Sequence, residues 1–304
     1  MNDRCFGNIP VPFPDENCYS LLCRYAVRSG QLSGSQVSME LFGHVQPLAG
    51  YVFKPFRIKD IRYWLGENEE ASELLRYGES HSCYPYYAAF LGPVHAGRII
   101  ECRMGSVLTP GQSKRINQEC GFTRIHKTNL WYCPECVRED FSRNGETCWR
   151  RAPQMPGVAY CPVHGVKLRE SGVSYQETNY QIIPATYAVI HLKEPRAETG
   201  NVYSERYIRL ARDIAWLLDN GLSLVNNDRV RQIFKTASGK DIGTYLPCRI
   251  SERNTRDSRF GDYLAGRILK ECNQNRIDST INRQMGMIFS IEDEFGSMEK
   301  FSEQ

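Results

Sequence analysis

Apolar positions recur at helical spacing in several stretches of this chain. The clearest lies over residues 204–221, where one apolar stripe is followed by Gly221. Its members are Tyr207, Leu210, Ala211, Ile214, Leu217 and Leu218. Such a stripe predicts an amphipathic helix that packs one face on the core, and glycine is preferred just past a helix end. Shorter patterns of the same kind predict helices over 226–239 and 254–275.

Two short helices are predicted near the start of the chain. Prolines precede the first helix, Asp15 or Asn17 is placed to cap it, and Gly30 follows its last apolar position. The second helix begins after a serine cap and ends at Gly43. Two helices joined by so short a turn are typical of a helix-turn-helix unit. From spacing alone the commoner helical hairpin, packed on the rest of the protein, is favoured.

The next part of the chain gives mixed signals. Residues 57–79 predict two further helices separated at Gly66. Residues 81–91 are aromatic and apolar, which indicates core packing, and Pro85 is expected to interrupt any regular element there. Frequent glycines over residues 92–128 favour short strands and loops.

Length and composition describe an ordinary globular protein with room for about two domains in 304 residues. No apolar run approaches the length of a membrane span, and the start lacks the apolar core of a signal peptide. We therefore expect a cytoplasmic protein, in which the twelve cysteines serve metal binding or core packing rather than disulfides. The net charge of +3 excludes a polycation but allows basic residues to cluster on one face.

The strongest chemical motif is a set of four metal-ligand residues. Cys133 and Cys136 form a C-x2-C pair, and after a gap of 24 residues Cys161 and His164 form a C-x2-H pair. This spacing predicts one tetrahedral Zn²⁺ with a structural role, because all four positions are filled by the protein. A segment of about 34 residues is too small to fold alone, so the metal would supply its folding energy. A weaker combination for a second metal site comprises Cys102, Cys120, His126 and Cys148.

The loop that this metal site closes contains Trp149, Arg150 and Arg151. Trp149 is expected in the core of the small metal-binding module, although a contact surface for a partner is the alternative. The two arginines suit phosphate groups of DNA or a partner protein, and a solvated position fits them equally well. We take both as candidate nucleic-acid contacts.

Basic residues also gather in the C-terminal third of the chain. The connection before the predicted helix 254–275 is rich in arginine and carries hydroxyl and amide side chains, and the helix before it contributes a lysine. Flexible cations beside a helix N-terminus favour phosphate contacts, as in a helix-turn-helix unit. The candidates are Lys235, Arg249, Arg253, Arg256 and Arg259. A solvated basic face is the alternative, and for Arg24 and Arg28, which share one helix face, it is favoured.

Residues 132–168 closely resemble the zinc segment of the TniQ/TnsD family of transposon target-selection proteins. The shared features are the two ligand pairs, the Gly145 turn, the WRR triplet, a Pro-Gly pair before the third ligand and Gly165. The resemblance extends over residues 10–90, where 81–91 is similar to the TnsD-type branch, and is looser beyond residue 200.

This resemblance implies a mainly α fold with a small zinc-ribbon-like module. The implied regions are an N-terminal helix-turn-helix-like region (1–127), a zinc-binding module (128–170) and a C-terminal helical, DNA-binding region (171–304). Members of the TnsD branch often continue into a further helical region beyond this length.

The resemblance also implies a non-enzymatic, nucleoid-associated adaptor. Such an adaptor binds double-stranded target DNA and recruits the AAA+ ATPase TnsC, which brings in the transposase. The alternative is an adaptor that docks on an RNA-guided Cascade complex and contacts DNA little. Some relatives pair up, so a homodimer is possible.

Overall fold

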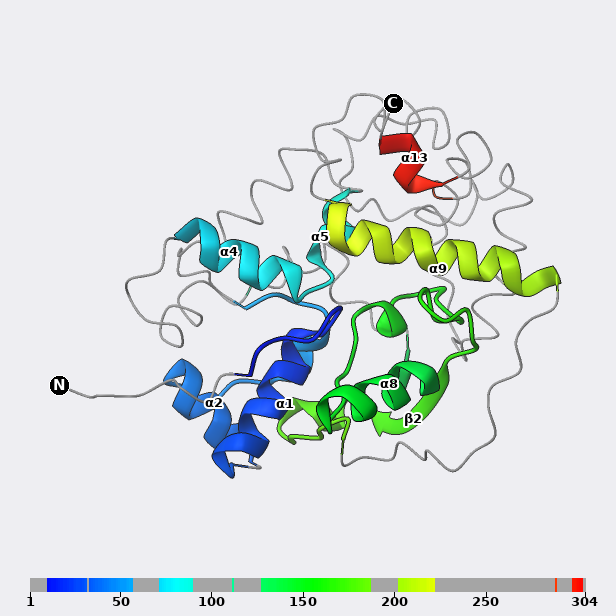
Figure 1. Ribbon diagram of the computed structural model, residues 1–304. Helices are drawn as coiled ribbons and strands as arrows, with labels where there is room; N and C mark the ends of the chain where they lie inside the picture. Colours follow the sequence, from blue (N-terminus) through cyan, green and yellow to red (C-terminus); the bar gives the residue numbers. More distant parts are fainter. Residues whose placement is uncertain are drawn as a thin grey trace.

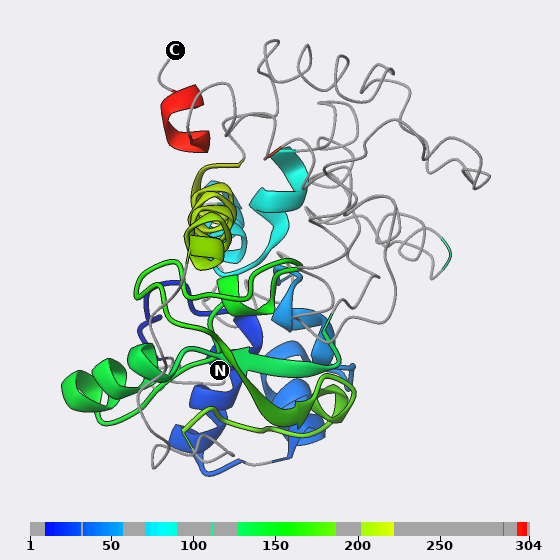
Figure 2. The same ribbon diagram turned by 90° about the vertical axis from the view of Figure 1, so that its right-hand side faces the viewer.

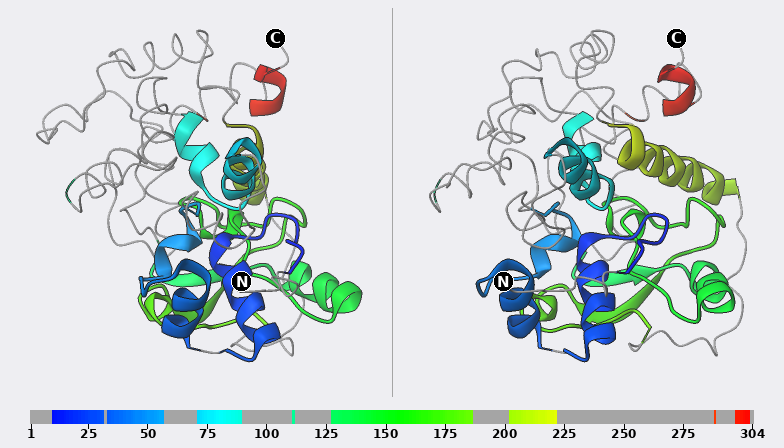
Figure 3. Two further views of the ribbon diagram at one scale, coloured as in Figure 1. Left: turned by 90° about the vertical axis from the view of Figure 1, so that its left-hand side faces the viewer. Right: turned by 60° about the vertical axis from the view of Figure 1, so that its left-hand side comes forward.

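The structure is a computed structural model in which helices predominate. It describes residues 10–31, 33–56, 71–89, 111, 127–186, 202–221, 288 and 297–302. The first two helices, the sheet and the long loop between its strands form a lower layer, and helices α4, α5, α9 and α13 lie above it (Figures 1 and 3). Within the described part of the chain, no helix combines the length and apolar character of a membrane-spanning segment.

Two helices open the described chain, as predicted. Helix α1 (Cys18–Ser29) is capped by Asn17, whose side chain accepts a hydrogen bond from a backbone amide of the first turn. Gly30 ends it in the left-handed conformation, and α2 (Gly34–Phe42) also ends at a left-handed glycine. Helix α1 is buried on all sides over its first nine residues, and α2 buries one face in the same core. The helical pair is therefore confirmed, whereas a helix-turn-helix function stays a prediction.

Helix α4 (Ala71–Ser80) matches the second half of the predicted pair over 57–79, and residues 57–70 lie outside the described chain. Residues of helix α5 (Tyr84–Ala89) are all buried. The prediction that Pro85 interrupts regular structure is wrong, because Pro85 lies in the first turn, where the missing N–H would have no intrahelical partner. Three short 3-10 helices are η1 (Ala49–Val52), η2 (Ala152–Gln154) and η3 (Glu177–Asn179).

The metal-binding region is built on a two-stranded antiparallel sheet. Strand β1 (Asn129–Tyr132) pairs with β2 (Arg169–Ser174), and the long loop between them carries helix α8 (Pro134–Asn144). Helix α8 projects from one side of this region (Figure 2). The sequence analysis missed this helix. Its signals were present, since Cys133 is the N-cap, a proline follows at the first helical position and Gly145 ends the helix.

Helix α9 (Val202–Asn220) runs above the loop and confirms the strongest helix prediction. It ends at Gly221, where a Cβ would clash with the backbone carbonyl of Pro85, so glycine allows α9 to pack closely on α5. Near the C-terminus, α13 (Met298–Ser302) contacts α9 through a hydrogen bond of 3.0 Å from the Met298 amide to Asp213.

One hydrophobic core spans the described chain. It includes side chains from α1, α2, α5, α9, both strands and the metal-binding loop. The largest fully buried members are Trp149, Tyr19, Tyr84, Tyr86 and Phe56. The described residues on both sides of the predicted boundary at 127/128 thus share one core.

Candidate metal centre

Two turns bring the four predicted ligands together. Cys133 caps α8 and Cys136 lies in its first turn, while Cys161 and His164 occupy the tight turn between the bridged residues 160 and 167. Their ligand atoms all lie within 4.8 Å of one another, and the three cysteines are buried. The predicted cluster is therefore present, and among the described residues it is the one group of this kind.

The spacing of the ligand atoms fits a tetrahedral metal ion. The Sγ atoms of Cys136 and Cys161 are 3.7 Å apart, and His164 Nδ1 lies 3.6, 3.4 and 3.6 Å from the sulfurs of Cys133, Cys136 and Cys161. A tetrahedron with metal–sulfur bonds of about 2.3 Å has edges of about 3.8 Å, and metal–nitrogen bonds of about 2.0 Å shorten the mixed edges. The donor set and its geometry both match a structural site closed to water.

Neighbouring groups orient these ligands. The backbone amides of Cys136 and His164 point at the sulfurs of Cys133 and Cys161, each at 3.4 Å. On the far side of the imidazole, His164 Nε2 lies 3.0 Å from Glu139 Oε1 on α8. A carboxylate that accepts from the outer ring nitrogen fixes the tautomer with Nδ1 free for the metal and increases its basicity. Glu139 was missed from the sequence, although its position six residues after Cys133 places it one turn beyond the ligands.

The sulfur cluster is costly without a cation. The pKa of the Cys136 thiol is raised by hydrogen bonding to Cys133 and Cys161 and by burial. Three thiolates this close would repel one another strongly in a buried place. A divalent ion bound at this cluster would remove that repulsion and would couple metal binding to folding of the loop.

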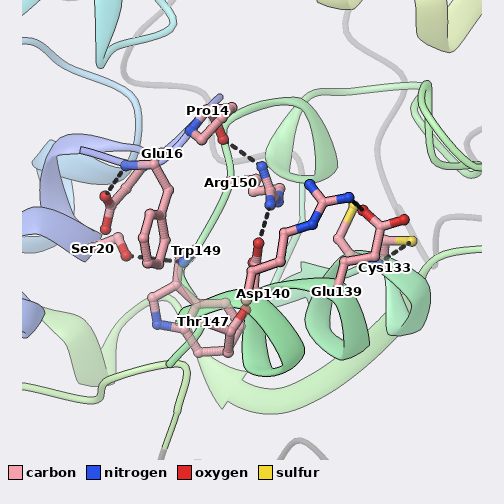
Figure 4. A network of polar contacts seen from close by, with 12 residues as sticks. Pro14, Glu16, Ser20, Cys133, Glu139, Asp140, Thr147, Trp149 and Arg150 are labelled. Carbon is pink, nitrogen blue, oxygen red and sulfur yellow. Dashed lines mark hydrogen bonds and ion pairs between the residues drawn. The ribbon is translucent and has the colours of Figure 1, made fainter. Parts of the chain in front are cut away.

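Trp149 is buried, as its structural interpretation predicts. Its ring is 0% exposed, and its Nε1 donates to the Ile183 carbonyl at 2.8 Å. The Trp149 amide donates to Ser20 Oγ at 2.9 Å, and its carbonyl accepts from the Asn17 amide at 3.0 Å. Figure 4 shows Ser20 beside this backbone. Trp149 therefore joins the metal-binding loop to the start of α1.

Arg150 is held inside the protein. Its guanidinium bonds to Asp140 Oδ1 at 2.7 Å and to the carbonyl of Pro14 (Figure 4). Its side chain is 16% exposed. Because Asp140 lies on α8 and Pro14 precedes α1, Arg150 links α8 to the N-terminal segment. Asp140 also accepts a hydrogen bond from the Thr147 hydroxyl at 2.9 Å.

Arg151 is even more enclosed, with 3% of its side chain exposed. Its guanidinium donates to Asp15 at 3.0 Å, to Asp219 at 2.6 Å, and to the carbonyls of Ser82 and Leu218. Burial raises the pKa of the Asp15 carboxyl, and the Arg151 charge opposes that shift. The terminal amino groups of both guanidinium groups bond within the chain. The structure thus favours internal packing over the predicted nucleic-acid contact of Arg150 and Arg151.

The same holds for Arg24, a minor candidate of the N-terminal unit. Arg24 is 4% exposed and bonds to Glu16 at 2.6 Å and to Glu146 at 2.9 Å, and Arg28 shares Glu146 at 3.0 Å. The favoured prediction of a solvated basic face therefore fits Arg28, which is 43% exposed, but not Arg24, which is buried and ion-paired. No local pattern in the sequence pairs these arginines with carboxylates more than a hundred residues away.

The remaining candidates lie largely outside the described residues. This applies to Lys235, Arg249, Arg253, Arg256 and Arg259, whose DNA contacts stay predictions. It also applies to three members of the weaker second metal set. The fourth, Cys148, is buried, and burial raises the pKa of its thiol.

Comparisons with known proteins show the family to which the chain belongs. A family model described as TniQ matches residues 9–168, and the chain belongs to the TniQ family. Within that class, it is 29% identical over 159 residues to the transposon Tn7 transposition protein TnsD of Escherichia coli. The match covers 52% of this chain and 30% of the length of that relative.

Loss of a metal ligand should unfold the metal-binding loop. We expect Cys136→Ser and His164→Ala to lose bound metal and to lower the melting temperature, because the remaining donors cannot complete the tetrahedron. Elemental analysis and thermal unfolding measure both effects. Cys148→Ala is the matched control, as it removes a buried thiol outside the cluster. A ligand variant that keeps stoichiometric metal and full stability would disprove the ligand assignment.

Glu139→Gln should weaken metal binding without removing a ligand. Loss of the carboxylate behind His164 is expected to lower metal affinity about 10- to 100-fold. Competition with a chromogenic chelator measures this change. Glu135→Gln, also in the first turns of α8 but bonded to Arg138, is the control. Equal affinity in the Glu139 and Glu135 variants would show that Glu139 does not support the imidazole.

Arg151→Gln tests the internal role of Arg151. Its removal leaves Asp15 and two backbone carbonyls without their partner, and we expect a loss of about 3 kcal/mol in unfolding free energy. Urea denaturation measures the loss. Arg143→Gln, at a site 74% exposed, should change stability little. Full stability of Arg151→Gln combined with weakened DNA binding would restore the nucleic-acid interpretation.

Proposed function

We propose that this chain is a target-site selection adaptor in bacterial DNA transposition, with no catalytic activity of its own. The observation that carries this proposal is membership of the TniQ family. The family match spans residues 9–168 and contains the complete four-ligand cluster. The similarity to a Tn7 transposition protein supports the same process. Because the match spans under a third of that relative, the activity of the whole relative is transferred only as a proposal.

The ion at the metal centre is Zn²⁺ in this proposal. Three thiolates and one imidazole are a donor set typical of structural zinc sites, and the edge lengths of 3.4–3.7 Å fit it. The ion holds the turn of Cys161 and His164 against the start of α8. Since all four coordination positions belong to the protein, the site has no place for a reactive water. Its role is to stiffen the loop that carries Trp149 and the two internal arginines.

The proposed partners are double-stranded target DNA and the AAA+ regulator TnsC. An adaptor of this kind needs one surface for each partner and a rigid body between them. The single core that joins α1, the metal-binding loop and α9 supports such a body. Direct contact with DNA is the part of the proposal that is simplest to test.

Salt dependence of duplex binding is the test. If cations neutralise phosphates, the logarithm of the binding constant should fall linearly with the logarithm of salt concentration. Arg253→Ala/Arg256→Ala should reduce the magnitude of this slope by about 2, at 0.9 per phosphate contact, and leave thermal stability unchanged. Fluorescence anisotropy with a labelled duplex measures both quantities.

A folded protein whose duplex affinity is flat with salt, or absent, would contradict direct DNA contact. Capture of TnsC by the same sample would then retain the adaptor role without DNA contact. Capture of a Cascade complex would select the docking alternative. Metal-dependent cleavage of the duplex would contradict the absence of catalysis.

A further inference from the structure

The turn that holds Cys161 and His164 packs directly on α9. The rings of Tyr160 and Tyr207 stack, with centroids 6.0 Å apart and planes inclined by 6°. A Cβ placed at Gly165 would lie 3.3 Å from Ile208 Cδ1, so the turn and the helix are in close contact. These contacts hold the N-terminal half of α9 against the turn of Cys161 and His164.

Three cations lie on this junction. Lys167 is exposed and forms an antiparallel bridge with Tyr160, whose ring faces α9. Arg209 and Arg212 are exposed on α9 and, three residues apart, lie side by side on the helix surface. Arg212 Nε donates to the Pro162 carbonyl at 3.3 Å, which places it against the metal-binding turn. We call Lys167, Arg209 and Arg212 the knuckle cations.

The knuckle cations differ from most other arginines of the described chain. Those considered above pair with carboxylates, whereas none of the three knuckle cations has a carboxylate partner within 4.0 Å among the described residues. The bond from Arg212 to Pro162 uses only Nε and leaves the terminal amino groups for another partner. Glu205, one turn before Arg209, is the exposed carboxylate on the same stretch of α9, so a positive excess remains.

We propose that the knuckle cations form a surface that binds the phosphate backbone of duplex DNA. This inference rests on the proposed function, in which DNA is a partner, and it assigns the contact to residues of the described fold. Two of the three are arginines, whose planar forks suit phosphate oxygens. Protein interfaces usually centre on an aromatic anchor, and here Tyr160 and Tyr207 are occupied by each other. The junction therefore fits a polyanion better than a protein partner.

The test compares two charge-matched triple variants of the full chain. Lys167→Gln/Arg209→Gln/Arg212→Gln removes the knuckle cations, and Arg28→Gln/Arg76→Gln/Lys300→Gln removes three exposed cations from α1, α4 and α13. In the control, Glu146 keeps Arg24 as a partner. Duplex binding is measured by fluorescence anisotropy over a salt series. The knuckle variant should lose at least about tenfold in affinity at low salt. The magnitude of its slope of log binding constant against log salt concentration should decrease by about 2.7, which is 0.9 for each of three lost phosphate contacts.

If the triple variant does not fold, a double variant that keeps Arg212 can be measured in its place. Lys167→Gln/Arg209→Gln leaves the Arg212 bond to Pro162 intact, and its slope should fall by about 1.8. The inference is overturned if wild-type protein binds duplex and the knuckle variants keep its slope, or if the control loses as much. Unchanged duplex affinity with lost capture of TnsC would assign the surface to a protein and also overturn it. Failure of wild-type protein to bind any duplex would reject the DNA-binding part of the proposed function itself.

Discussion

Convergence of three thiols and one imidazole, whose ligand atoms all lie within 4.8 Å of one another, is the constraint on which the rest of the structure depends. A metal ion bound by these four groups would neutralise the thiolates and hold the loop between β1 and β2 closed. Closure in turn fixes Trp149, Arg150 and Arg151, which form consecutive links from the loop to α1, α8, α5 and α9. A small metal-binding segment thereby becomes the centre of a much larger core rather than an appended module.

Within this core, the two arginines illustrate how position decides the role of a charge. An arginine in a loop beside a metal site is equally suited to a phosphate or to a buried carboxylate. Here Asp15, Asp140 and Asp219 are already in place, and the four hydrogen bonds of Arg151 reach three separate segments. The positive charge holds the segments together and is not available to a ligand. Lys167, Arg209 and Arg212 face solvent instead, on the metal-binding turn and α9.

The sequence allowed the metal ligands, α1, α2 and α9 to be predicted because their signals are local. Two residues separate the ligands of each pair, Asn17 and Gly30 mark the ends of one helix, and the stripe from Tyr207 to Leu218 repeats every turn. The same local rules would have found α8 from its cap, its proline and its glycine. Pro85 was misread because a proline is tolerated in the first turn of a helix, and where a helix begins depends on its tertiary neighbours.

The partners of the buried arginines could not be predicted in this way. Asp15 lies 136 residues from Arg151, and Glu146 lies 122 residues from Arg24. A single sequence holds no record of which distant carboxylate meets which cation. Glu139 is an intermediate case, since its place on α8 follows from the sequence once the helix is recognised, whereas its contact with His164 depends on how the second ligand pair folds back.

Helix α9 is attached to the metal-binding loop at both of its ends. The stacked tyrosines and Pro162 hold its first half, and Arg151 binds the carbonyl of Leu218 and the side chain of Asp219 in its last turn. A rod supported at two separated points cannot swivel about either one, because tilting at one support strains the other. A force applied to α9 is therefore transmitted to the metal-binding loop at both contacts. The helix and the loop move as one rigid unit, and α9 does not act as a hinge.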